Sequence, residues 1–258
     1  MYDFEFVKPS TVDEAVAALS SEDAQVLGGG QTLIPTMKQR LASPTKLVSL
    51  SGIVGMAGVS EDGGTVTIGG GTTHADVAAA GLGAVSALAG NIGDPSVRNR
   101  GTIGGSLANN DPSADYPAAA LALGATIVTN TREITADEFF DGMFTTALEE
   151  GEIITAVKFT SPSAANYQKF EQPASRFALA GVFVAKTADG VRIAVTGASE
   201  EGVHRWTAAE EALNANFSAD ALDSLSVSAD GMIADLHGSA DYRANLVKVL
   251  TQRAVAAC

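Results

Sequence analysis

Glycine triplets that follow short apolar segments are the feature of this sequence that most restricts its fold. Residues 24–27 run into Gly28-Gly29-Gly30, and residues 65–68, which alternate polar and apolar side chains, run into Gly69-Gly70-Gly71. Each junction predicts a β-strand that ends in a tight turn, because glycine adopts positive φ without steric cost and lets a ligand or another segment come close. The sequence therefore predicts strand-and-turn units, which do not recur at a fixed repeat length.

The remaining segments carry the periodicity of helices and further strands. Thr11 to Glu14 fits a capping box, and apolar residues follow it at the spacing of one helix face. Pro35 falls in the first turn of a short helix, where its missing N–H costs little. By the same criteria we expect strands over residues 24–27, 46–50, 65–68, 125–128 and 153–159, and helices over 12–19, 31–41, 74–92 (one or two) and 116–123.

Residues 93–115 form a long segment of glycine and polar residues without a charge block. Connections of this length without secondary structure are uncommon in compact domains and are usually functional or disordered. The segment contains Thr102-Ile103-Gly104-Gly105-Ser106, in which hydroxyl residues flank a glycine pair. We expect this pair to supply positive φ and free backbone N–H groups for an anionic ligand.

The last hundred residues have a different pattern. Residues 162–166 resemble a linker, and strands are expected over 177–185 and 191–196, joined across the turn Asp189-Gly190. Helices are expected over residues 207–213 and 243–257. The pattern predicts a separate α+β domain over residues 163–258, with no glycine-rich ligand site of its own.

Cysteine and histidine usage excludes several kinds of metal site. The only cysteine is Cys258, so a thiolate-bound zinc or an iron–sulfur cluster cannot be held within this chain. His74, His204 and His237 lie far apart and are interpreted as surface or structural residues. No Ser-His-Asp set or pair of carboxylates stands out, so we expect neither a metal ligand nor a catalytic residue in this chain.

Charge and hydropathy restrict the partners. The net charge is −14, which argues against binding to nucleic acid or to an anionic membrane, because both need Lys and Arg to neutralise phosphate. No apolar run approaches the roughly 20 residues that span a bilayer, and the start of the chain lacks the features of a secretory signal. We therefore expect a cytoplasmic protein that is not an integral membrane protein.

The two glycine segments together favour a specific ligand. The first glycine segment comprises residues 27–33 and the second comprises residues 102–106. Neither has the G-x-G-x-x-G spacing of a Rossmann unit. Two such segments, the second followed by Asn109 and Asp115, suit a ligand with two phosphates and a polyol. FAD is such a ligand.

The sequence resembles the FAD-binding medium subunits of carbon monoxide dehydrogenase and related molybdenum hydroxylases, including the flavin domain of xanthine dehydrogenase. The resemblance covers almost the whole chain. It rests on Leu27-Gly28-Gly29-Gly30-Gln31-Thr32-Leu33-Ile34-Pro35 with Met37-Lys38, on residues 98–108 leading to Asp115, on residues 167–170 and on residues 241–243.

This resemblance implies an α+β protein with a vanillyl-alcohol-oxidase-type FAD-binding fold. Two α/β subdomains, about residues 1–52 and 53–162, would clasp an extended FAD, and the C-terminal α+β domain would follow over 163–258. The implied cofactor-binding residues are those of the two glycine segments and four residues beyond them: Leu27, Gly28, Gly29, Gly30, Gln31, Thr32, Leu33, Thr102, Ile103, Gly104, Gly105, Ser106, Asn109, Asp115, Ile154 and Lys169.

The resemblance also implies roles for these residues. Thr102, Ser106 and Asn109 would contact phosphate or ribityl oxygens, and Asp115 would hold ribityl hydroxyls or a polar edge of the flavin. Ile154 and Lys169 fall where relatives approach the isoalloxazine ring. Phe177 lies where a related subunit has an aromatic side chain over the flavin, but packing in a core is the favoured interpretation of this residue and the flavin contact is the alternative.

By the same resemblance, this chain would be one subunit of a larger complex. Its partners would be an iron–sulfur small subunit and a large subunit with the molybdopterin cofactor, assembled as a dimer of heterotrimers. The xanthine dehydrogenase branch has a lysine where this chain has Glu171, which argues against direct reduction of NAD. A quinone, a cytochrome or another one-electron carrier is an alternative external acceptor, and the sequence leaves the choice among these, NAD and oxygen open. Two alternatives are a self-contained FAD oxidase and a non-redox nucleotide-binding protein.

Overall fold

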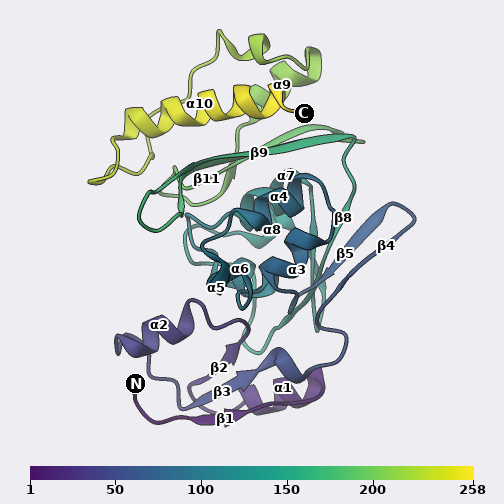
Figure 1. Ribbon diagram of the computed structural model, residues 1–258, viewed down its shortest axis with the longest axis vertical. Coiled ribbons are helices and arrows are strands. Elements are labelled where there is room, and N and C mark those ends of the chain that lie inside the picture. The colour runs from purple at the N-terminus through teal and green to yellow at the C-terminus, as the bar shows by residue number, and fades with distance from the viewer.

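A computed structural model describes residues 1–258 and contains three separate β-sheets. The sheets lie within residues 5–49, 59–160 and 164–205, and they are stacked along the long axis of the molecule (Figure 1). Helices accompany each sheet, so the predicted α+β class is confirmed. As independent domains, the segments 1–52, 53–162 and 163–258 stay a prediction.

The N-terminal sheet is parallel and has the strand order β1-β3-β2. Its helix α1 begins as predicted, because the Thr11 hydroxyl accepts a hydrogen bond from the N–H of Glu14. Ala15 of this helix packs on Val48 of the sheet in a small apolar core. The elements are β1 (Glu5–Val7), α1 (Val12–Leu19), β2 (Ala24–Leu27), α2 (Leu33–Lys38), β3 (Lys46–Ser49) and the 3-10 helix η1 (Leu50–Gly52).

The middle sheet is antiparallel, with the order β4-β5-β8-β6-β7, and it supports most of the helices. Every residue of α7 is buried, because this helix packs between the middle part and strands β10 and β11 of the C-terminal sheet. The elements are β4 (Val59–Asp62), β5 (Thr65–Gly69), α3 (His74–Ala79), α4 (Ala84–Gly90), α5 (Pro95–Arg98), α6 (Ile103–Asn109), α7 (Tyr116–Ala122), β6 (Thr126–Thr129), β7 (Glu133–Thr135), α8 (Ala136–Phe139) and β8 (Ile154–Thr160).

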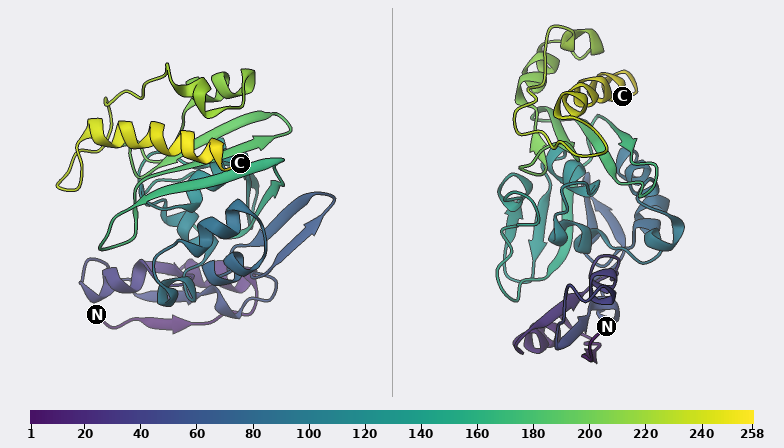
Figure 2. Two further views of the ribbon diagram at one scale, coloured as in Figure 1. Left: turned by 45° about the horizontal axis from the view of Figure 1, so that its top comes forward. Right: turned by 90° about the vertical axis from the view of Figure 1, so that its left-hand side faces the viewer.

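The C-terminal sheet has the order β12-β11-β10-β9, with α10 lying across β9 and β10. Figure 2 shows α9 and α10 covering the outer side of this sheet, at the opposite end of the molecule from the N-terminus. None of the helices is long and apolar enough to span a membrane. The elements are β9 (Ala164–Glu171), β10 (Ala178–Thr187), β11 (Gly190–Thr196), β12 (His204–Arg205), α9 (Thr207–Ala215), the 3-10 helix η2 (Ala219–Leu222) and α10 (Ala240–Ala256).

Two predictions about connecting segments were wrong. Residues 93–115 are not an unstructured loop, because α5 and α6 lie within them. Asp94 and Thr102 accept N-cap hydrogen bonds that start these helices, and the many glycines had hidden that signal. The predicted linker over 162–166 is also wrong in part, since Ala164 already begins β9. The predicted strand over 177–185 is β10, which is the second strand of its sheet along the chain, after β9. Phe177 lies just before β10.

A buried ion pair joins the middle part to the C-terminal sheet. Lys169 Nζ on β9 lies 3.0 Å from the carboxylate of Asp115, the residue before α7, and the two side chains are 3% and 5% exposed. The Tyr167 hydroxyl donates to the same carboxylate at 2.6 Å, and Lys169 also donates to the carbonyl of Asn91 at 3.2 Å. Burial raises the pKa of Asp115, and its cationic and phenolic partners oppose that rise.

We expect Lys169→Met to lower the free energy of unfolding at pH 7 by about 3–5 kcal/mol, because Asp115 would remain buried without its counter-ion. The double variant Lys169→Met/Asp115→Asn should recover part of this loss, since it removes both charges. Lys158→Met is the matched control, because its pair with Glu133 is exposed and such pairs contribute about 0–1 kcal/mol. Urea denaturation measures all three; equal losses for Lys169→Met and the control would contradict this account.

Candidate active site for a flavin cofactor

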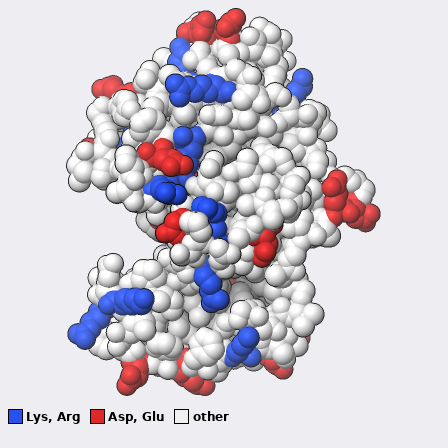
Figure 3. Space-filling view, viewed as in Figure 1, with Lys and Arg blue, Asp and Glu red and all other residues white.

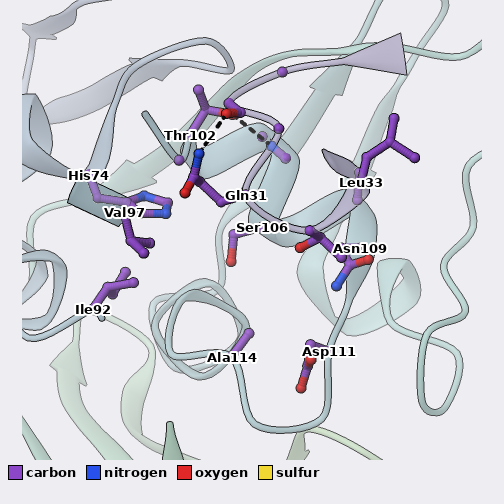
Figure 4. A pocket seen from close by; sticks show the side chains of 18 of the residues that line it. Gln31, Leu33, His74, Ile92, Val97, Thr102, Ser106, Asn109, Asp111 and Ala114 are labelled. Atoms are coloured by element: carbon purple, nitrogen blue, oxygen red, sulfur yellow. Dashed lines mark hydrogen bonds between the residues drawn. The ribbon is translucent and has the colours of Figure 1, made fainter. Parts of the chain in front are cut away.

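The main cavity has a volume of about 780 Å³ and lies where the N-terminal and middle parts meet. Its lining comes from the β2–α2 turn, the segments around α3, α5 and α6, the start of β8, and the β9–β10 turn. Figure 4 shows side chains from several of these segments pointing into one space. Figure 3 shows the molecule narrowing at this level. The size falls within the range of small-molecule and cofactor sites.

The first glycine segment provides a run of free hydrogen-bond donors. None of the six backbone N–H groups from Gly28 to Leu33 donates to another group of the chain, and all six residues line the cavity. Gly30 has φ +72°, which turns the backbone between β2 and α2. Successive free N–H groups on a turn attract an anion, so this segment can hold a phosphate.

Close backbone contacts bring the glycine segments together. A Cβ on Gly29 would overlap the carbonyl of Arg100, and one on Gly104 would lie 2.6 Å from the carbonyl of Gly70. Neither position has room for a side chain. Glycine at these two positions therefore lets the β2–α2 turn, the turn after β5 and the start of α6 meet around one cavity.

The prediction that the second glycine segment offers free N–H groups and positive φ was wrong. The N–H groups of Ile103 and Gly104 donate to backbone carbonyls after β5, at 3.1 and 2.9 Å, and the N–H of Gly105 donates to the Thr102 hydroxyl at 3.1 Å. Gly105 has an ordinary helical φ within α6. Gly105 is exposed to the cavity between Thr102 and Ser106, and its lack of a side chain leaves space there for a ligand.

The structure brings nearly all the predicted site residues together. Ile103 is buried in the core instead, and Lys169 lies behind Asp115 in the ion pair rather than on the cavity wall. The lining residues among those predicted are Leu27, Gly28, Gly29, Gly30, Gln31, Thr32, Leu33, Thr102, Gly104, Gly105, Ser106, Asn109, Asp115 and Ile154.

Several apolar side chains also line the cavity. Ile154, at the start of β8, is joined there by Ile92 and Val97. Phe177 also lines the cavity, and its side chain is 48% exposed, which argues against a role in core packing. Ile92 and Val97 were not predicted, because a single apolar residue in a glycine-rich segment carries no periodic signal. Apolar walls of this kind suit a flat aromatic ring.

His74 is a site residue that sequence reasoning missed. It is the first residue of α3, is only 5% exposed and lines the cavity, so it is not a surface residue. Its Nδ1 has no hydrogen-bond partner, and its ring lies 5.2 Å from that of Tyr116. Burial, with a smaller contribution from the nearby charge of Arg98, lowers the pKa of His74 to about 4. The imidazole is therefore neutral at pH 7.

This pKa predicts a pH dependence of stability. Between the ordinary value of about 6.5 and the folded value of about 4, His74 binds a proton in the unfolded chain but not in the folded one. Stability from this residue is thus complete above pH 6.5 and falls by roughly 3 kcal/mol as the pH drops to 4. Urea denaturation of the cofactor-free protein at pH 7 and pH 4 should show this loss for the parent and not for His74→Phe. An equal loss in both would contradict it.

The lining fits FAD. The free N–H groups from Gly28 to Leu33 suit the diphosphate, and Ser106 and Asn109 offer polar side chains to a polyol. The wall that includes Ile154 and Phe177 suits the flavin ring. No lining residue is a cysteine, and Cys258 lies exposed at the C-terminal end, so the chain itself offers no thiolate next to the cavity.

Comparison with known proteins agrees with this geometry. Residues 2–162 match the family described as the FAD binding domain in molybdopterin dehydrogenase. The nicotine 6-hydroxylase medium subunit of Paenarthrobacter nicotinovorans is 36% identical, with 97% of this chain and 95% of that protein covered. The carbon monoxide dehydrogenase medium chain of Hydrogenophaga pseudoflava is 34% identical, with 98% and 96% covered.

Solved structures give the same result. A chain of carbon monoxide dehydrogenase from Hydrogenophaga pseudoflava superposes with a TM-score of 0.90 at 34% identity, covering 99% of this chain and 97% of that one. Quinoline 2-oxidoreductase from Pseudomonas putida 86 gives 0.88 at 27% identity, with 99% and 96% covered. The resemblance inferred from the motifs is thereby confirmed. The chain belongs to the family of FAD-binding subunits of molybdopterin dehydrogenases.

Proposed function

We propose that this chain is the electron-transfer subunit of a molybdenum hydroxylase, in which it receives electrons from an iron–sulfur subunit and passes them to an external acceptor. The observation that carries the proposal is the run of six unpaired N–H groups beside an apolar-walled cavity. This arrangement binds a flavin dinucleotide but places no cysteine or metal-ligand cluster beside it. In this proposal substrate oxidation belongs to partner subunits, as the names of the relatives as medium subunits of hydroxylases and dehydrogenases support.

The chain's own residues place and shield the cofactor. FAD accepts electrons in pairs or singly, which lets it connect one-electron and two-electron partners. Gly28 to Leu33 bind the diphosphate through backbone N–H groups, and Ser106 and Asn109 contact the phosphate or ribityl oxygens. Ile154 and Phe177 flank the ring. Asp115 holds ribityl hydroxyls or a polar edge of the flavin, while Lys169 acts through its ion pair with Asp115.

The partners follow from the relatives, whose names describe medium subunits and medium chains of dehydrogenases and hydroxylases. We propose an iron–sulfur small subunit and a molybdopterin-binding large subunit, assembled as a dimer of heterotrimers in the cytoplasm. Glu171 is exposed on β9, two residues from Lys169. An acidic side chain there favours an uncharged or cationic one-electron acceptor over the anionic NAD.

We expect the isolated chain to carry FAD but to hydroxylate nothing. Tagged protein purified from its own host should bring down an iron–sulfur subunit and a larger molybdenum subunit, and only this complex should oxidise a substrate with an artificial acceptor. The substrates to assay are carbon monoxide, purines, aldehydes and N-heterocycles. Turnover by the isolated chain would indicate a self-contained oxidase, and a chain without flavin absorbance would indicate a non-redox nucleotide-binding protein.

We expect Gly105→Val to remove FAD from a folded protein. The new Cβ would lie 3.0 Å from the Thr102 hydroxyl and its methyl groups would enter the cavity, which displaces the diphosphate. A displaced diphosphate would lose contacts to the N–H groups from Gly28 to Leu33. Loss of two such hydrogen bonds to a charged group costs roughly 3–6 kcal/mol, or about two to four orders of magnitude in affinity.

Ser106→Ala is the matched control for this variant, because it removes one hydroxyl and adds no bulk. It should retain most of its FAD when the cofactor is saturating. Flavin content after gel filtration, and the rise in melting temperature on adding FAD, measure both. If Gly105→Val retains FAD like the parent, the diphosphate does not lie beside α6.

A further inference from the structure

We propose that His74 is a cofactor-binding residue, whose neutral imidazole donates a hydrogen bond from Nε2 to an oxygen of the FAD diphosphate. The proposal rests on the proposed flavin function and adds an imidazole donor to the backbone N–H groups of the first glycine segment. His74 had been assigned to the surface or to packing by its isolation in the sequence.

The position of His74 connects it with the first glycine segment. Its backbone N–H donates to the carbonyl of Gly101 at 2.9 Å, and a Cβ on Gly101 would lie 2.5 Å from Nε2. A Cβ on Gly29 would in turn lie 2.6 Å from the Cα of Gly101. The backbone of Gly101 therefore contacts both the imidazole and the turn that carries the free N–H groups. Figure 4 shows the imidazole of His74 directed into the cavity, on the side where Gln31 lies.

The hydrogen-bonding state of the ring assigns the proton. Nδ1 is fully buried and has no partner, whereas Nε2 is the ring nitrogen left on the cavity side. A buried N–H without an acceptor is rarer than a buried acceptor without a donor, so the tautomer with hydrogen on Nε2 is favoured. The neutral ring then presents a donor to the cavity.

The surroundings of the ring keep it neutral without removing the donor. Tyr116 packs on the ring and Arg98 lies nearby, and no carboxylate is among the groups that shift its titration. Arg98 itself is directed elsewhere, because it donates to the carbonyls of Ile92 and Gly93. A buried histidine with no acidic partner and one unpaired nitrogen lowers the stability of the fold, so packing alone does not explain this residue. A bound anion that accepts from Nε2 explains its place on the wall.

The test compares His74→Phe, which keeps a flat buried ring and removes the donor, with His74→Gln, whose amide N–H reaches about as far as Nε2. Dissociation constants of the cofactor-free proteins are measured for FAD and for ADP, which carries the diphosphate without the flavin. His74→Phe should weaken both ligands by a similar factor of roughly ten to one hundred. His74→Gln should recover most of this affinity.

The unfolding of cofactor-free protein at pH 7 separates binding from structure. His74→Phe should be at least as stable as the parent, because it removes an unsatisfied buried nitrogen. Unchanged binding of both ligands would overturn the proposal, as would a loss for FAD alone, which would place the contact on the flavin. Failure of His74→Gln to recover binding would show that packing caused the loss. If the parent itself did not bind FAD, the flavin function would fail independently of this comparison.

Discussion

The close approach of backbone segments that lack side chains is the constraint on which the rest of this structure depends. Gly29 lies against Arg100 and Gly101, and Gly104 lies against Gly70, so three turns from different parts of the chain meet within the contact distance of main-chain atoms. A side chain at Gly29 would push the N-terminal part away from the middle part, and one at Gly104 would push α6 away from the turn after β5. Because the contacts use up the N–H groups at the start of α6, only the β2–α2 turn keeps its N–H groups for a ligand.

The sequence predicted the parts of the fold that local rules determine. The capping signal at Thr11 and the glycine turn after β2 act over a few residues, and both are present in the structure. The helices within residues 93–115 were missed because their N-caps, Asp94 and Thr102, stand among glycines that weaken helical periodicity. Strand β9 was missed because its residues do not alternate regularly between polar and apolar, so the sequence gives little strand signal before β10, with which it pairs.

The sequence motifs predicted which residues line the cavity better than they predicted the hydrogen-bonding role of each residue. The motif residues do gather, yet two of them are held by partners that were not predicted, one at the N-cap of the same helix and one far away in the sequence. Gly105 N–H is satisfied by Thr102, and Lys169 is committed to Asp115, 54 residues away in the sequence. His74 was dismissed because a lone histidine in the sequence has no visible partner. Its significance arises only when the fold places it beside Gly101.

Electrostatics explains why such a site uses uncharged donors. The chain carries a net charge of −14, and on the face in Figure 3 acidic and basic side chains occur at both ends and also near the waist. Within the cavity, Asp115 is paired with Lys169, and Glu152 is held by Arg132, which lowers the pKa of that carboxyl to about 2. These two acidic groups are thus compensated by cations, whereas Asp94 and Asp111 line the cavity without an ion-pair partner.

Charged side chains, among them Arg176 and Asp111, also line the cavity, but the free donors of the first glycine segment and the ring of His74 are dipoles without net charge. Dipoles in a partly enclosed site attract a dianion without adding a cation that would change the charge of the flavin's surroundings. Backbone N–H groups can hold a diphosphate in this way without a Lys or Arg on each phosphate. The donors available to a diphosphate are therefore distinct from the ion pair of Asp115 and Lys169.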